Sequence, residues 1–144
     1  MSLITLVYVS FAEHTMTDSE LRELLEESRQ NNARLNITGM LLYRDGFFIQ
    51  ALEGEAEVVD ELYANIAKDP RHTHVVTVYR NKITERSFGT WSMGFNILRD
   101  DALTEEQRDY FTDFLHDKKD MSRFVKNPGY ASALLESFKE RSYF

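Results

Sequence analysis

The sequence has 144 residues, of which 42% are hydrophobic and 28% charged, a composition typical of a single globular domain. Its formal charge of −7 makes the surface acidic on average, which disfavours nucleic acid or an anionic membrane as a partner. Because the chain contains no cysteine, disulfides, thiolate nucleophiles and zinc-thiolate sites are excluded.

The N-terminal segment, residues 3–9, is a short and nearly continuous run of strand-forming apolar residues, which predicts a central strand covered on both faces. The run is too short to span a bilayer and lacks the features of a signal peptide, so we expect a cytoplasmic protein. The strand period of two places Ile4, Leu6, Tyr8 and Ser10 on one face.

Residues 17–31 predict the first helix. Thr17 and Glu20 have the spacing of a capping box, and apolar residues follow at helical intervals. We expect Glu26 and Glu27 on this helix to be solvated. The inner stripe, which becomes polar towards the C-terminal end, is Leu21, Leu24, Leu25, Ser28 and Asn32.

The middle of the chain predicts four strands and a second helix. Residues 37–43 and 47–53 form an antiparallel pair, because an Asp-Gly pair between them favours a tight hairpin turn. A helix follows from Glu55 and stops at an Asp-Pro pair. Residues 75–79 and 91–98 predict two further strands, the second weakened by an internal glycine.

The order β-α-β-β-α-β-β predicts an α+β fold, a ferredoxin-like sheet with both helices on one face. The other face requires a cover, which we expect from two C-terminal helices, the first opening with Thr104 and Gln107. We therefore expect residues 1–100 to form the main domain and 101–144 a helical cap within the same globular unit. Their apolar residues are Phe111, Phe114 and Leu115 in the first helix and Leu134, Leu135 and Phe138 in the second.

Two polar residues lie on strand faces that are otherwise apolar. The hydroxyl of Tyr8 requires a partner if the residue is buried, and a backbone carbonyl would be an ordinary one. Gln50 lies between Phe48 and Leu52, where an unsatisfied amide would cost roughly 1–3 kcal/mol. If the strand is central, the amide must hydrogen-bond to a buried network or to a polar ligand. If the strand lies at an edge of the sheet, the amide can hydrogen-bond to water.

Asn31 and Asn32 admit two interpretations. They terminate the first helix, or they join Ser28, Tyr8 and Gln50 around one cleft between the helices. Two carboxamides and two hydroxyls in such a cleft suit a flat heteroaromatic ligand with donors and acceptors along one edge. The apolar lining would be Leu24, Phe48, Leu52 and Ile66.

Several motifs occur in a characteristic order. They are Tyr8 on the first strand, Asn31-Asn32 before Ile37-Thr38-Gly39, Phe48-x-Gln50-x-Leu52-Glu53-Gly54, Asp69-x-Arg71-His72 and Trp91-Ser92-Met93. In these motifs, over about residues 3–98, the sequence resembles the BLUF domain, the sensor of blue light using FAD. With two predicted helices after this segment, the chain is similar to short, stand-alone, PixD-like photoreceptors.

The resemblance implies a noncovalently bound flavin between the two helices: FAD, with FMN or riboflavin as alternatives. It implies Asn32 at the pyrimidine edge of the ring, Asn31 nearby, and Gln50 bridging Tyr8 to the N5/O4 region. Asn65 stands near the ring's other carbonyl, where some relatives carry Arg, so flavin affinity and redox potential are expected to differ. Ser28, Leu24, Phe48 and Ile66 would line the ring, and Asp69 and Arg71 the ribityl and phosphate end.

The implied mechanism is light-driven electron and proton transfer from Tyr8 to the flavin, after which return of the electron leaves Gln50 rotated or tautomerised, with an altered bond to the flavin carbonyl. The strand bearing Trp91 and Met93 would pass this change to the C-terminal helices. Without cysteine, a cysteinyl adduct is not available. We therefore expect a homo-oligomeric photoreceptor, not an enzyme, that signals to an unidentified downstream protein and uses no metal, membrane or nucleic acid.

Two other functions remain open from the residues alone. An acylphosphatase of the same architecture would need a glycine-rich phosphate loop with an Arg after the first strand, where this chain has residues 10–14, Ser-Phe-Ala-Glu-His. A light-independent regulatory domain that senses a small ligand would use the same cleft for an amino acid or nucleotide. The photoreceptor would be yellow when purified, whereas either alternative would be colourless.

Overall fold

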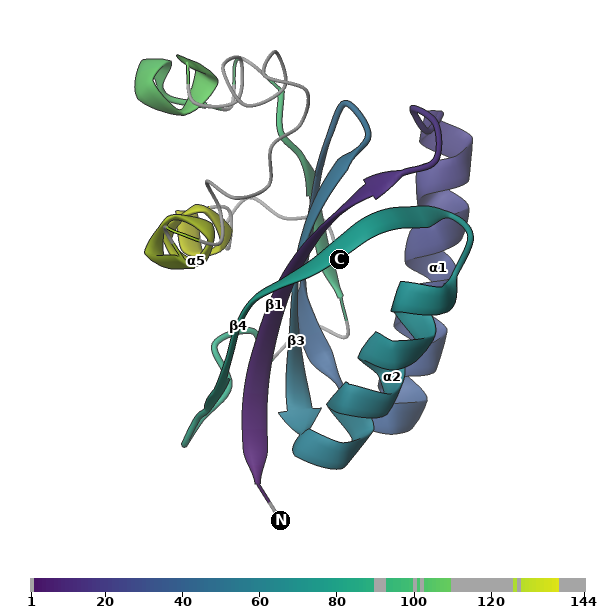
Figure 1. Ribbon diagram of the computed structural model, residues 1–144, viewed down its shortest axis with the longest axis vertical. Helices are drawn as coiled ribbons and strands as arrows, with labels where there is room; N and C mark the ends of the chain where they lie inside the picture. Colours follow the sequence, from purple (N-terminus) through teal and green to yellow (C-terminus); the bar gives the residue numbers. More distant parts are fainter. Residues whose placement is uncertain are drawn as a thin grey trace.

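The computed structural model describes residues 2–89, 93–99, 101, 103–109, 126 and 128–137. Five strands form one sheet in the order β4-β1-β3-β2-β5 (Figure 1). Neighbouring strands are antiparallel except for β2 and β5, which are parallel, so the predicted ferredoxin-like α+β arrangement with one added strand is confirmed. The elements are β1 (Leu3–Ala12), α1 (Asp18–Leu35), β2 (Thr38–Arg44), β3 (Phe47–Glu55), α2 (Ala56–Lys68), β4 (His72–Lys82), β5 (Gly94–Ile97) and α5 (Pro128–Ser137).

The sheet lies between two apolar layers. Helices α1 and α2 cover one face, and α5 lies over the opposite face (Figure 1). Alternate residues of β1 divide between the layers, with Ile4, Leu6 and Tyr8 on the helix-covered face and Val7 and Val9 on the other. The buried residues that α5 adds to the second layer are Ala131, Leu134 and Leu135.

Helix α1 begins as predicted and ends later than predicted. Thr17 and Glu20 form both hydrogen bonds of the capping box. The predicted end at Asn31 is wrong, because the helix continues to Leu35 and is closed by Asn36 in the left-handed conformation, at φ 56°. Asparagine tolerates this conformation, so Asn36 supplies the stop that the sequence suggested at Asn31 and Asn32.

The hairpin between β2 and β3 uses the predicted Asp-Gly turn. Asp45 has φ 47° and Gly46 has φ 88°, so both central residues adopt the positive φ that a two-residue turn of this hand requires. The turn fixes the register, in which Arg44 pairs with Phe47 and Leu41 with Gln50. Strand β3 is therefore held between β1 and β2 in the middle of the sheet.

Strands β4 and β5 differ from their predicted limits. β4 begins at His72, three residues before the predicted start, and runs to Lys82. β5 is only Gly94–Ile97, so Gly94 starts the strand and does not interrupt it. The predicted strand residue Trp91 lies outside the described residues.

The C-terminal segment is described in part. Residues 105–109 are helical, and Thr104 and Gln107 exchange the two hydrogen bonds of a helix cap, at 2.9 and 3.2 Å. The predicted apolar residues Phe111, Phe114, Leu115 and Phe138 lie outside the described residues. In the described parts of the chain, no helix combines the length and the apolar character needed to cross a membrane.

A buried carboxylate anchors the segment that leads to β5. Glu53 in β3 is 1% exposed and accepts backbone hydrogen bonds from Ser87 at 3.2 Å and Phe88 at 2.8 Å. Burial raises the pKa of this carboxyl above its usual range, against the effect of the two bonds. Arg86 adds hydrogen bonds of 2.9 Å to the Glu53 carbonyl and to Thr38 Oγ1. These contacts hold residues 86–88 against β2 and β3.

Candidate functional site

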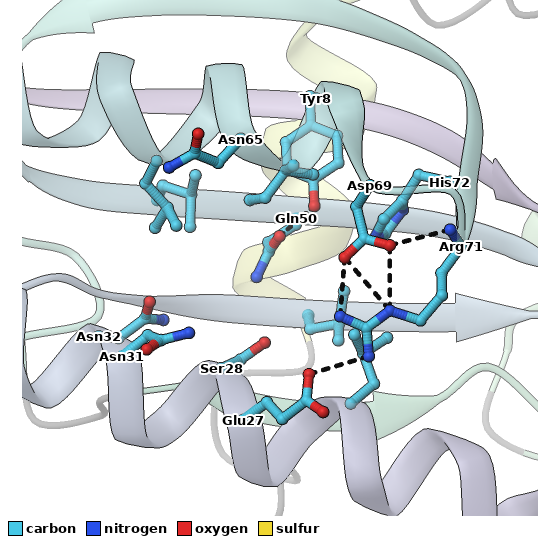
Figure 2. Close-up of a pocket in the computed structure, with 15 residues that line it drawn as sticks. Tyr8, Glu27, Ser28, Asn31, Asn32, Gln50, Asn65, Asp69, Arg71 and His72 are labelled. Carbon is cyan, nitrogen blue, oxygen red and sulfur yellow. Dashed lines mark hydrogen bonds and ion pairs between the residues drawn. The ribbon is translucent and has the colours of Figure 1, made fainter.

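A cavity opens between α1, α2 and the face of the sheet that these helices cover (Figure 2). Every residue predicted from the sequence to line the cleft is in its wall, except Phe48. The residues that line it are Tyr8, Leu24, Glu27, Ser28, Asn31, Asn32, Leu41, Gln50, Leu52, Leu62, Asn65, Ile66, Asp69, Arg71 and His72.

Tyr8 and Gln50 are hydrogen-bonded partners on adjacent strands. They stand directly opposite each other in the register of β1 and β3, which brings their side chains together on one face. The Tyr8 hydroxyl donates to Gln50 Oε1. Both residues are buried, at 1% and 4% exposure, and burial raises the pKa of Tyr8 far above its ordinary value. The phenol is therefore a neutral donor, and its partner is the side-chain amide.

The other end of the Gln50 amide is also bonded. Gln50 Nε2 donates to the sulfur of Met93 at 3.3 Å, just before β5. The Met93 carbonyl in turn accepts from Arg29 Nε at 3.0 Å. A chain of contacts thus joins Tyr8, Gln50, Met93 and α1, and it leaves the amide with a defined orientation. Sequence reasoning identified Tyr8, Gln50 and Met93 but not Arg29.

The polar edge of the cavity is built mainly by α1. Ser28, Asn31 and Asn32 follow one another along the helix, and Asn65 lies across the cavity on α2 (Figure 2). Asn32 is 2% exposed, whereas Asn31 is at the rim and accepts from Arg34 Nη2 at 3.3 Å. The second interpretation of the asparagine pair, a polar cavity wall, is therefore the one that the structure supports.

The mouth of the cavity is charged. Arg71 donates to Asp69 from Nε and Nη2, at 3.1 and 2.7 Å, and pairs with Glu27 at 2.9 Å (Figure 2). The hydrogen bond from Arg71 lowers the pKa of Asp69 and raises that of Arg71. Asp69 and Arg71 are therefore both ionised at neutral pH. Glu27 was expected to be only solvated, because a half-exposed helical glutamate carries no pattern that indicates a cross-cavity partner.

His72 lines the cavity, whereas Phe48 is not among the lining residues. Nδ1 of His72 is hydrogen-bonded to Ser10 Oγ at 3.0 Å, and burial lowers the pKa of the imidazole, which favours the neutral ring. Phe48 is fully buried, with its ring 5.0 Å from Tyr43 and 5.1 Å from His72. The prediction that Phe48 lines the cavity is corrected accordingly, because its ring packs into the core and supports the wall from behind.

The donor set fits a flat heteroaromatic ring. Buried carboxamides from Asn32 and Gln50 supply donors and acceptors, while Leu24, Leu52 and Ile66 supply apolar surface for the faces of a ring. Among the described residues, no group of three His, Cys, Asp or Glu side chains is arranged to hold a metal ion. Hydrogen bonds from these carboxamides and contacts with these apolar side chains can hold such a ring without a covalent bond.

Comparison with known proteins identifies a family and relatives to which this chain is similar. The family model described as "BLUF: Sensors of blue-light using FAD" matches residues 3–94. The chain is 42% identical over 93 residues to the photoactivated adenylate cyclase subunit beta of Euglena longa and 43% over 88 residues to subunit alpha of Euglena gracilis. These matches cover 64% and 61% of this chain but only 11% and 9% of the two relatives.

Solved structures have the same fold. The dark-state structure of BlrB, a BLUF protein, superposes with a TM-score of 0.74 at 29% identity, covering 97% of each chain. The photo-activated state of BlsA gives a TM-score of 0.71 at 30% identity, covering 93% of this chain and 94% of that one. A bacterial light-regulated adenylyl cyclase gives 0.73 at 31% identity, covering 87% of this chain and 38% of the cyclase.

Proposed function

Because the chain belongs to the BLUF family of flavin-binding blue-light sensors, we propose that it signals blue light by rearranging the hydrogen bonds of Tyr8 and Gln50. The buried chain from Tyr8 through Gln50 to Met93 is the observation that carries this proposal. The Gln50 amide oxygen is bonded to Tyr8 and its nitrogen to Met93. Rotation of the amide by half a turn therefore exchanges the acceptor and the donor that face these two residues. We propose that the protein itself is a sensor and not an enzyme.

The residues that would hold the flavin are those of the cavity wall. We propose that Asn32 and Gln50 hydrogen-bond the polar edge of the ring, with Asn31, Ser28 and Asn65 around them. Leu24, Leu52 and Ile66 would pack against its faces, and Asp69 and Arg71 would meet the sugar-alcohol tail. These roles combine the donor chemistry of the wall with the residue types expected from the family motifs.

Bound in this cavity, a flavin would supply blue-light absorption and an acceptor for an electron and a proton. On the protein side, the Tyr8 phenol stays protonated and directs its hydrogen to Gln50. Loss of that hydrogen from Tyr8 removes the bond that orients the Gln50 oxygen. Gln50 then rotates or tautomerises, the electron and the proton return to Tyr8, and the amide is left presenting a different group both to the cavity and to the Met93 sulfur.

We propose that the change leaves the site through Met93. Its carbonyl is bound by Arg29 of α1 and its sulfur by Gln50, so a new Gln50 orientation alters the start of β5. The cover over the far face of the sheet, which includes α5, would pass the signal to a downstream protein partner. The cyclase activities in the names of the relatives are not carried over, since the match spans only 11% of subunit beta of Euglena longa.

The test is the absorption spectrum of the purified full-length chain before and after blue light. We expect a flavin spectrum that shifts reversibly to longer wavelength and recovers in the dark, because the ring carbonyl gains an altered hydrogen bond. Flavin released by denaturation serves as the control and should show no such shift. A colourless protein, or bound flavin with no shift, would contradict the proposal and favour a light-independent ligand sensor.

Replacing Asn32 with alanine should weaken flavin retention. The side chain is buried, and two ring hydrogen bonds of about 1 kcal/mol each would be lost, which is roughly a thirtyfold rise in Kd. Flavin occupancy after dialysis and the dissociation constant measure the effect. Asn81→Ala, an exposed site on β4, is the matched control and should leave both unchanged. Equal retention in the two variants would contradict the role of Asn32.

A further inference from the structure

Met93 is held at three points by residues of three different elements. Gln50 Nε2 of β3 donates to its sulfur at 3.3 Å, and Arg29 Nε of α1 donates to its carbonyl at 3.0 Å. A Cβ at Gly39 of β2 would lie 3.3 Å from its terminal methyl, so this methyl packs against the β2 backbone. Met93 is 1% exposed, and these protein contacts, not water, therefore fix its position.

The Arg29 contact acts on the main chain of Met93, just before the paired part of β5. The ladder between β2 and β5 begins with Met40 opposite Gly94, the residue after Met93. Arginine stays charged in proteins, and a charged donor makes a stronger hydrogen bond to a carbonyl than a neutral donor does. Arg29 therefore fixes the Met93 main chain relative to α1, the helix that also carries the buried Asn32 of the cavity wall.

A fixed Met93 makes two orientations of the Gln50 amide unequal in energy. In the observed orientation, the amide nitrogen faces the Met93 sulfur and donates to it. After half a turn of the amide, its oxygen faces the sulfur, so two acceptors meet and the hydrogen bond is lost. A mobile Met93 could move its sulfur away from this oxygen, whereas a Met93 held by Arg29 keeps the two acceptors together. The Arg29 contact therefore favours return of the amide to its observed orientation.

We infer that Arg29 is a positioning residue, which holds Met93 beside Gln50 and thereby sets the rate at which the switch returns to its dark state. This role rests on the proposed function, because it assumes that light reorients the Gln50 amide. Arg29 is not among the described residues that line the cavity, so it acts through Met93 and not by contact with the flavin. Its loss leaves the size of the red shift unchanged and lengthens the lifetime of the shifted state.

Dark recovery after a pulse of blue light, followed on the full-length flavin-loaded protein, measures this effect. Arg29→Met removes every donor, and the red shift should keep its wild-type size but decay roughly two- to tenfold more slowly, the factor that one net hydrogen bond is worth. Arg29→Lys should recover at an intermediate rate, because an ammonium donates to the carbonyl without the geometry of the guanidinium. Arg22→Met is the control, because Arg22 is an exposed residue of α1 outside the cavity wall.

A double-mutant cycle with Met93→Leu shows whether Arg29 acts through the sulfur. Leucine has about the volume of methionine but no sulfur acceptor, so Arg29 has no pair of acceptors to hold together. Arg29→Met should therefore leave the recovery rate of Met93→Leu unchanged, whereas a residue that only supports the fold would slow both backgrounds alike.

Four results would overturn the role of Arg29. They are unchanged or faster recovery in Arg29→Met and Arg29→Lys, the same slowing in Arg22→Met, a smaller red shift in Arg29→Met at equal flavin occupancy, and full slowing by Arg29→Met in the Met93→Leu background. A wild-type protein that binds flavin and shows no red shift would instead overturn the proposed function, and the role of Arg29 with it.

Discussion

Replacement of Tyr8 by phenylalanine is expected to abolish the light-induced red shift while the protein remains folded and yellow. The substitution removes one oxygen from a ring that is otherwise packed against Tyr63, at 5.4 Å between centroids. The lost hydrogen bond should cost only about 1 kcal/mol of stability. Without the hydroxyl, Gln50 has no Tyr8 donor to hold its oxygen and no source of the transferred hydrogen.

The measurement is the difference spectrum after blue light, on variants whose flavin occupancy has first been equalised. Gln50→Leu should also abolish the shift, because no amide remains to reorient. Tyr43→Phe is the matched control: it removes a buried hydroxyl that accepts from the backbone of Met16, away from Gln50, and should leave the shift intact. A normal light-induced red shift in Tyr8→Phe would disprove the proposed mechanism, although the chain would still belong to the family.

The parts of the site that the sequence predicted are those with a strong local signal. Tyr8 and Gln50 interrupt apolar faces, and a period of two places each on a definite side of its strand. Their hydrogen bond depends on which strands pair and in what register. The paired strands β1 and β3 are separated in the sequence by α1 and β2. The contact between them was therefore implied by the family resemblance and could not be worked out from the spacing.

Long charged side chains were the main omission. Glu27 and Arg29 lie outside the apolar stripe of α1, and yet Glu27 reaches Arg71 across the cavity and Arg29 reaches the Met93 carbonyl. The flexible reach of such side chains lets a residue at the edge of a helix find a tertiary partner that the apolar stripe does not reveal. The end of α1 was missed for a related reason, since three candidate asparagines stand in one segment and only Asn36 has the left-handed backbone.

Replacing Gly39 with alanine should be the most destabilising small change in the β2–β3 pair. A Cβ at this position would lie 1.9 Å from the carbonyl oxygen of Ala51 and 3.3 Å from the Met93 terminal methyl. Real Cβ atoms do not approach a backbone oxygen so closely, so two central strands would have to separate. Forced backbone shifts in a packed core cost about 3 kcal/mol, or roughly 10 °C in Tm for a chain of this size.

Thermal unfolding measures the loss, and Gly129→Ala provides the control. A Cβ at Gly129 on α5 meets nothing within 4 Å, so that change should leave Tm unaltered or raise it slightly. Gly39→Ala should also affect the switch, because the displaced Met93 sulfur is the acceptor for Gln50 Nε2. Any folded fraction should then show an altered light-induced shift. Equal melting temperatures for Gly39→Ala and wild type would mean that β2 and β3 are not in the close contact that brings Met93 beside the amide.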